Sequence, residues 1–304
     1  MSVFSNISLA RKSMKKIVVV HGMKRSGNHA IINWLKAHDR FIFCNNVIPI
    51  APVLNGKIVI PPPEEFTLWF QWQLITNKHN ISQITNGHKL FPFFLKKIAL
   101  QRYLPFFLKK IALQRYSPFF LKKINLQKYS MISSLEDHDL KLKTFLKPPC
   151  EVSNVLIMRD PYNMFSSRIR RASRIESPVY PKKSGSRMDE VIQLWKSHAR
   201  EYLGLTNYLE NKVCIHFDSW FSNRDYRKNI SRKLNFEFTD NGFSEVSRAG
   251  GGSSFDGTEF NGNNKMMNVL NRHSHLKDSE RQLLENIFAD AELQEFAHKI
   301  RSQP

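Results

Sequence analysis

The sequence contains little cysteine, no long hydrophobic run and no apolar leader. Its three cysteines, Cys44, Cys150 and Cys214, are too few and too far apart for a disulfide framework or a zinc site, which favours a reducing compartment. No stretch approaches the roughly 18 apolar residues of a membrane span. The N-terminal segment also lacks the cleavage signature of a secretory signal. We therefore expect a cytoplasmic protein.

Positive charge is abundant, because 46 Lys and Arg residues exceed 26 Asp and Glu residues and give a net charge of +20. Such a charge indicates an anionic partner, a class that includes phosphorylated donors, acidic polysaccharides, membrane surfaces and nucleic acid. Charge alone does not choose among these partners.

Nearly half of this charge lies in an internal repeat. Within residues 92–130, a 13-residue unit occurs three times in near-identical copies and supplies nine basic residues. Short copies of this kind are typical of an in-frame duplication, whereas solenoid units run about 20 to 50 residues. We predict a single domain over residues 1–304 with a helical repeat insertion at residues 92–130. The insertion is a candidate for peripheral association with the anionic inner face of a membrane, and we do not expect nucleic acid as a partner.

The pattern of apolar residues predicts an α/β fold. Residues 16–20 form a β-branched run, and a short loop connects them to residues 29–35, which have helical spacing; this is the opening unit of a doubly wound sheet. Residues 41–63 are expected to be irregular, and residues 171–187 to form a mobile loop. Further strands are predicted at 129–135, 154–158 and 213–217, and helices from residue 162, over 188–211 and over 279–301.

The loop Lys24-Arg25-Ser26-Gly27-Asn28-His29 combines several ways of holding a phosphate. Gly27 lets the backbone approach an anion, the first helical turn presents its N–H groups, and Arg25 and Ser26 add donors. For this motif alone, a plain strand-to-helix turn with an exposed Lys-Arg pair is the alternative. The Walker A pattern G-x-x-x-x-G-K-[ST] is absent, which disfavours a nucleoside triphosphatase.

A second anion-binding pattern follows the strand predicted at 154–158. Arg159 stands at the carboxyl end of this strand, where open α/β sheets bind ligands, and Ser167 follows eight residues later. The two side chains could donate to a second phosphate. A surface arginine and a solvated serine are the alternative.

Together, these patterns resemble the sulfotransferases that use 3′-phosphoadenosine-5′-phosphosulfate (PAPS) as sulfuryl donor. Residues 25–29 after a strand resemble the 5′-phosphosulfate loop of that family, and Arg159-Asp160-Pro161 with Ser167 resembles its 3′-phosphate site. With residues 267–272, these segments look like bacterial sulfotransferases of glycan-modifying type. The resemblance covers roughly residues 15–275 apart from the repeat.

The resemblance implies a P-loop-like central parallel sheet flanked by helices, PAPS as co-substrate, no metal, and an acceptor hydroxyl on a carbohydrate or glycolipid. It matches Arg248 and Gly250 to the loop that closes over the 3′-phosphate, although residue 249 is alanine where the family usually has a second basic residue. A flexible linker is the alternative for this loop. The other residues to which the resemblance assigns donor binding are Lys24, Arg25, Ser26, Gly27, Asn28, His29, Arg159 and Ser167.

In-line sulfuryl transfer requires a base for the acceptor hydroxyl and positive groups that hold the leaving phosphate. The resemblance makes Arg25 the group that stabilises the bridging oxygen, with Lys24 as a weaker candidate. It places the base at the end of the preceding strand, with Glu136 as first choice, His138 as reserve and His88 as third candidate. A solvated acidic turn is the alternative at residues 136–138. Two other functions stay open, namely a P-loop nucleotide-dependent kinase and a basic protein that binds nucleic acid or a membrane surface.

Overall fold

A computed structural model of the chain describes residues 15–45, 53–54, 57–58, 130–141, 150–174, 186–247 and 252–302. The repeat insertion, the candidate base His88, and the candidate donor-binding residues Arg248 and Gly250 lie outside the described residues. Among the helices within these ranges, none is both long and apolar enough to cross a membrane.

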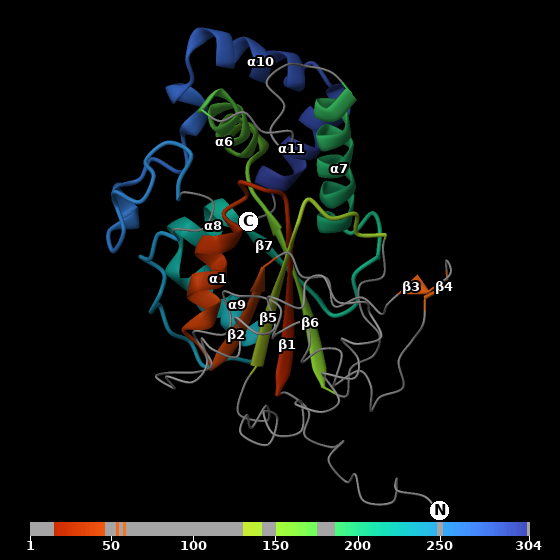
Figure 1. Cartoon of the computed structure of the whole chain (residues 1–304), viewed down its shortest axis with the longest axis vertical. Coiled ribbons are helices and arrows are strands. Elements are labelled where there is room, and N and C mark those ends of the chain that lie inside the picture. The colour runs from red at the N-terminus through yellow and green to blue at the C-terminus, as the bar shows by residue number, and fades with distance from the viewer. Residues whose placement is uncertain are drawn as a thin grey trace, which may run out of the picture.

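A five-stranded sheet forms the centre of the molecule, with the strand order β2-β5-β1-β6-β7 (Figure 1). All neighbouring strands in it are parallel. The predicted central parallel sheet flanked by helices is thereby confirmed. The strands are β1 (Lys16–Gly22), β2 (Phe41–Asn45), β5 (Ser130–Glu136), β6 (Glu151–Met158) and β7 (Lys212–His216).

The strand order brings the carboxyl ends of three strands together. β1 lies between β5 and β6, and Gly22 at its end is in register with Glu136 and Ile157. The loops that follow these strands therefore start side by side, although they are far apart in the sequence. This edge of an open α/β sheet is the usual place for a ligand.

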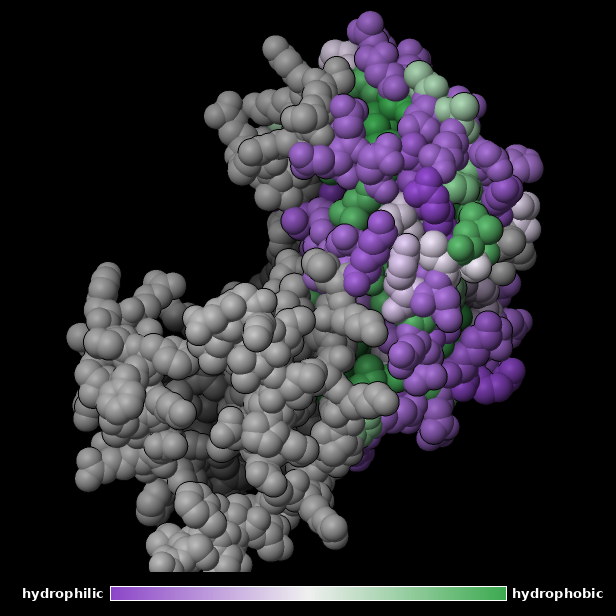
Figure 2. All heavy atoms as spheres, turned by 90° about the vertical axis from the view of Figure 1, so that its right-hand side faces the viewer, coloured by the Kyte–Doolittle hydropathy of each residue, from purple (hydrophilic) through white to green (hydrophobic). Residues whose placement is uncertain are grey.

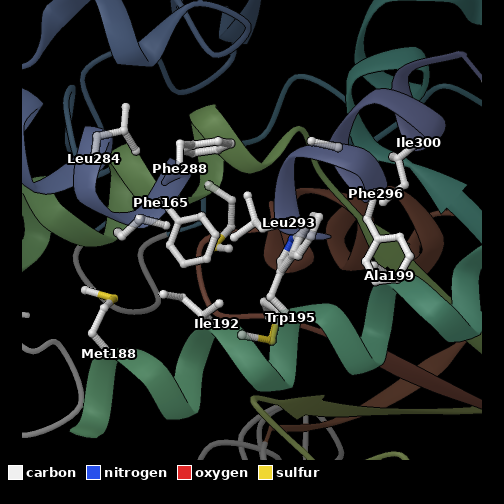
Figure 3. Packing of buried hydrophobic residues seen from close by; sticks show 14 of the residues in the cluster. Phe165, Met188, Ile192, Trp195, Ala199, Leu284, Phe288, Leu293, Phe296 and Ile300 are labelled. Carbon is white, nitrogen blue, oxygen red and sulfur yellow. The ribbon is translucent and has the colours of Figure 1, made fainter. Parts of the chain in front are cut away.

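Helices cover both faces of the sheet, and each side has its own apolar core (Figure 1). On one face, α1 (Asn28–Lys36), α8 (Phe217–Ser222) and α9 (Arg224–Lys233) pack against alternate strand side chains. On the other side, a second cluster joins four helices (Figure 3). These are α6 (Pro161–Arg174), α7 (Ser186–Tyr202), α10 (Asp278–Phe288) and α11 (Ala291–Ser302).

The amphipathic pattern of α7 explains how this second cluster forms. Met188, Ile192, Trp195 and Ala199 recur at intervals of three or four residues, so they share one face of the helix, and all four are buried. The described surface on the right-hand side of Figure 1 is mainly hydrophilic, with small separate apolar spots (Figure 2). The helices on this side therefore turn their apolar faces inward.

The segment 41–63, predicted to be irregular, contains strands. β2 pairs with β5 at the edge of the sheet, and β3 (Val53–Leu54) forms a short hairpin with β4 (Lys57–Ile58). Phe41 and Phe43 are packed against the core of the α1 face. The prediction was wrong because β2 is stabilised by a partner strand that lies far along the sequence.

The helix predicted over 188–211 ends earlier, at Tyr202. Gly204 has a φ of 75°, in the left-handed region that glycine favours. The N–H of Leu205 donates to the carbonyl of Arg200 at 2.8 Å, which with the N–H of Gly204 makes a Schellman motif. A glycine near the end of an apolar pattern was the signal for this stop.

The closing helix predicted over 279–301 is two helices. Asp290 interrupts it and accepts the backbone N–H of Leu293 at 3.0 Å, so it caps the start of α11. Within the loop predicted at 171–187, residues 171–174 belong to α6 and residues 175–185 lie outside the described ranges.

Phe165 provides a test of the second cluster. Its buried ring lies 6.4 Å from that of Trp195 and 6.3 Å from that of Phe288, between centroids (Figure 3). Phe165→Ala leaves a cavity, so we expect the free energy of unfolding in urea to fall by about 3–5 kcal/mol. The control Leu205→Ala truncates a side chain that is 60% exposed. It should change this free energy by less than about 0.5 kcal/mol, and equal losses in the two variants would contradict the packing described.

Candidate functional site

A cavity lies at the carboxyl edge of the sheet, where the loops after β1, β5 and β6 meet. Its wall also includes residues of α1, α6, α8 and the segment 252–272. Ser26 is buried, and neither Ser26 nor His138 lines the cavity. The structure nevertheless brings the two predicted anion-binding patterns together. The predicted site residues on the wall are Lys24, Arg25, Gly27, Asn28, His29, Glu136, Arg159 and Ser167.

The loop after β1 has an unusual backbone. Arg25 has a φ of 73° and Gly27 a φ of 87°, both in the left-handed region. Packing also requires glycine at position 27, because a Cβ there would lie 2.1 Å from the ring of Phe217. A non-glycine residue held at positive φ costs of order 1–3 kcal/mol, and such residues cluster at functional sites. The backbone conformation of Arg25 therefore supports a functional role for this loop.

Asp137 holds this loop from the end of β5. Its carboxylate accepts the backbone N–H of Lys24 at 2.9 Å and pairs with Arg168 at 2.7 Å. The ammonium of Lys24 lies 3.5 Å from the same carboxylate. Asp137, which was not among the predicted site residues, is therefore a structural support of this loop. Its position directly after an apolar strand, beside Glu136, was the available signal.

Arg159 is buried, with 4% of its surface exposed, and its guanidinium joins two distant segments. Nη1 donates to the carbonyl of Arg25 at 3.0 Å, and Nη2 donates to the carbonyl of Val269. The hydroxyl of Ser167 donates to the carbonyl of Asn163 at 2.9 Å. The phosphate contacts of Arg159 and Ser167 thus stay predictions. To bind a phosphate, these side chains would have to share or give up the hydrogen bonds that they make to carbonyl groups.

Arg272 is, with Arg159, one of two buried arginines on the cavity wall, and it was not among the predicted site residues. It does lie in the last segment of the family resemblance, which was a usable signal. Its guanidinium donates to Ser253 Oγ at 3.0 Å and lies 3.3 Å from Asp256. Burial lowers the pKa of Arg272 to about 9, and the charges of Arg159 and Arg25 add to this effect against that of Asp256. The wall is therefore rich in positive charge.

Several buried polar atoms of this wall make no hydrogen bond to the rest of the described chain. They include Nε of Arg159, Nε of Arg272 and Oγ of Ser254, together with the side-chain oxygens of Asn28 and Asn264. Leaving such a group unsatisfied costs about 1–3 kcal/mol, so these atoms mark a place for a polar ligand or water. Ser254 belongs to the loop predicted to close over the donor, and the described part of that loop, residues 252–254, lines the cavity.

Asp218 faces Arg159 from α8. Its Oδ1 lies 4.0 Å from Nε of Arg159. Burial raises the pKa of Asp218 from 3.8 to about 6, and the opposing effect of Arg159 is smaller. This carboxyl group therefore takes up a proton more readily than an exposed aspartate does.

Glu136 and His29 face each other on the wall. Oε1 of Glu136 accepts a hydrogen bond from Nδ2 of Asn28 at 3.0 Å and lies 3.8 Å from Nε2 of His29. The reserve candidate His138 lies off the cavity wall, and its carbonyl accepts from Nε2 of His198 at 2.9 Å. The geometry favours Glu136 over His138 and adds His29 as a neighbour.

No family model and no curated sequence matches the chain. Among solved structures, it is similar to a sulfotransferase domain from the Synechococcus PCC 7002 olefin synthase, with a TM-score of 0.42 and 10% identity over 95% of both chains. It is also similar to a sulfotransferase domain from the curacin biosynthetic pathway, with a TM-score of 0.45 and 10% identity over 95% of this chain and 98% of that one. Similarity at this level does not decide function, which has to be inferred from the site.

Gly27→Ala tests the packing of the loop. Besides the strain of a positive φ, its Cβ would collide with the Phe217 ring. We expect the free energy of unfolding in urea to fall by more than about 2 kcal/mol. Gly204 also has a positive φ, of 75°, but a Cβ there meets nothing within 4 Å. The control Gly204→Ala should therefore cost only about 1–2 kcal/mol, and an equal cost at both positions would contradict the packing of Phe217 on Gly27.

Asp218→Asn tests the burial of that carboxyl. Its folded pKa of about 6 lies above the ordinary 3.8, so the folded state binds the proton more tightly. The stabilisation from that proton is present below the ordinary pKa and is lost as the pH rises through 6. We expect the variant to be more stable than wild type by about 2–3 kcal/mol at neutral pH, with the difference shrinking as pH falls toward 4. Urea denaturation across this range measures it; a variant less stable at neutral pH would show that the pairing with Arg159 dominates.

Proposed function

We propose that the chain is a sulfotransferase that moves the sulfuryl group of PAPS to an acceptor hydroxyl. The observation that carries this proposal is the meeting of the loop after β1 with two buried arginines, Arg159 and Arg272, on one cavity. PAPS carries two separate anionic groups, the 5′-phosphosulfate and the 3′-phosphate. The cavity has two groups of donors that could hold them.

The first donor group is the loop with the start of α1. This nine-residue helix has no acidic residue in its first turn, so its positive end is available to an anion. Nη1 of Arg25 donates to the carbonyl of Gly252 at 3.1 Å, which places the guanidinium between the loop and the segment 252–257. In our proposal, Arg25 stabilises the negative charge that grows on the bridging oxygen as the bond to sulfur breaks. Lys24 is the weaker candidate, because its ammonium is paired with Asp137.

The second donor group consists of Arg159, Arg272 and Ser254, whose unsatisfied buried donors would hold the 3′-phosphate. Ser167 lies on the same wall and could add its hydroxyl. A bound phosphate would also offset the mutual repulsion of the arginines, which contributes to the lowered pKa of Arg272.

A nucleotide-dependent kinase is the second candidate, and the loop disfavours it. Asn28 follows Gly27 where the Walker A pattern has its lysine, and Nδ2 of Asn28 donates to Glu136 and to the Met23 carbonyl. A basic protein that binds nucleic acid or a membrane would not require a buried cluster of arginines around a cavity.

We further propose a carbohydrate or glycolipid hydroxyl as the acceptor, on the strength of the family resemblance. We also propose a cytoplasmic location, which the low cysteine content supports, and peripheral membrane binding through the basic repeat at 92–130, which the charge of that repeat supports. Transfer of label from radioactive PAPS to a panel of glycans, lipid extracts and phenols tests the acceptor. Labelling confined to the phenols would overturn this choice.

Thermal unfolding with 3′-phosphoadenosine-5′-phosphate (PAP) tests donor binding, and sulfate transfer by Arg25→Ala tests the role of Arg25. PAP at 100 times its Kd should stabilise the fold by about 2.7 kcal/mol, and ATP with magnesium should not. Arg25→Ala should lower sulfate transfer by at least about 100-fold, because it removes charge stabilisation from the leaving group. The control Arg224→Ala, whose side chain in α9 is 68% exposed, should leave transfer unchanged. Stabilisation by ATP and not PAP, or full transfer by Arg25→Ala, would contradict the proposal.

A further inference from the structure

We infer that His29 removes the proton from the acceptor hydroxyl and that Glu136 positions its imidazole. This inference rests on the proposed sulfotransfer and names a further residue in its chemistry. The family resemblance assigned His29 to donor binding, at a position where the family usually has a small polar donor. The geometry of this chain gives the residue a different role.

Both side chains stand on the cavity wall beside the first donor group. His29 is the second residue of α1, and Glu136 is the last residue of β5. Nε2 of His29 lies 3.8 Å from Oε1 of Glu136. A shift of about 0.8 Å would bring the pair to hydrogen-bond distance, and catalytic hydrogen bonds are often long before the substrates bind.

Contacts with other side chains orient the pair. Nδ2 of Asn28 donates to Oε1 of Glu136 at 3.0 Å, which fixes the carboxylate beside α1. The ring of His29 lies edge-on to that of Phe43, with 6.1 Å between centroids. The hydrogen bond from Asn28 thus holds in place the oxygen of Glu136 that faces His29.

An imidazole is by its nature a stronger base than a carboxylate, because the ordinary pKa of histidine is about 2 units above that of glutamic acid. Burial lowers the pKa of His29 most, Glu136 raises it, and Arg25 and Lys36 lower it. These charges come from β5, from the loop after β1 and from α1 itself. The balance keeps the ring neutral at neutral pH and able to accept a proton.

The proposed step conserves atoms and electrons. With its Nε2–H turned to Glu136, the neutral ring of His29 keeps a lone pair on Nδ1. The acceptor O–H bond breaks, its proton passes to Nδ1, and the oxygen forms the new bond to sulfur. The bond from sulfur to the bridging oxygen breaks, and its electron pair leaves with PAP, where Arg25 stabilises the charge. Glu136 stabilises the imidazolium, which then releases its proton to solvent.

The experiment compares His29→Gln and Glu136→Gln with the control His298→Gln, which changes an exposed histidine of α11. Release of PAP from PAPS, with water as the acceptor, is measured from about pH 5 to 9. We expect His29→Gln to lower kcat by about 100-fold or more. The acid limb of the pH profile, which is the fall in kcat that wild type shows below the ordinary histidine pKa, should be absent from this variant. Its affinity for PAP, from thermal shifts, should stay within about threefold of wild type.

Glu136→Gln gives a second readout that a purely structural role would not produce. Because Glu136 raises the pKa of His29, its loss should move the limb of the pH profile to lower pH and lower kcat less than His29→Gln does. The control His298→Gln should match wild type. If His29→Gln does not fold, the direction of the shift in Glu136→Gln decides the matter.

Three results would overturn the inference. Wild-type turnover by His29→Gln, or an unchanged limb in that variant with a larger loss in Glu136→Gln, would make Glu136 the base. A parallel loss of PAP affinity in His29→Gln would return this residue to donor binding. Absence of both PAP binding and PAPS turnover in wild type would instead refute the proposed function, and the role of His29 with it.

Discussion

The candidate site depends on one buried guanidinium. Arg159 donates to the carbonyls of Arg25 and Val269, and so it joins the loop after β1 to a segment near the other end of the described chain. The carboxylate of Asp137 accepts the backbone N–H of the neighbouring Lys24 and so holds the loop at a second point. A residue at positive φ, such as Arg25, persists only where its surroundings over-determine it. The hydrogen bonds of Arg159 and Asp137 supply that constraint and hold the loop beside the cavity.

Two buried arginines carry positive charge beside this loop. Arg159 and Arg272 are buried on the cavity wall, and their nearest carboxylates, Asp218 and Asp256, lie 4.0 and 3.3 Å away. Burying charge without full compensation is unfavourable, and the described carboxylates compensate these arginines only in part. In our proposal, a bound phosphate pairs with these donors, which links donor binding to the stability of the fold.

Local patterns were sufficient for the elements around the first loop. The β-branched run of β1, the helical spacing of α1 and the strand β6 were predicted because each is formed by residues close in sequence. The edge strand β2 was missed because its stability comes from pairing with β5. Asp137 and Arg272 were not assigned a role, although each lies in a segment that the sequence marked, because their contacts with Lys24 and Asn163 join positions more than 100 residues apart.

The sequence by itself determined the two anion-binding patterns, their order and the class of fold, because a strand, a loop and a helix follow from local residue types. Only the tertiary structure decided which candidates share a cavity. His29 and Glu136 face each other because β1 and β5 pair in parallel with Gly22 opposite Glu136, and α1 starts just beyond that point. Residue spacing carries no information about such a register, since strand pairing is set by long-range packing. The proposed donor loop is thus a property of the sequence, and the proposed base is a property of the fold.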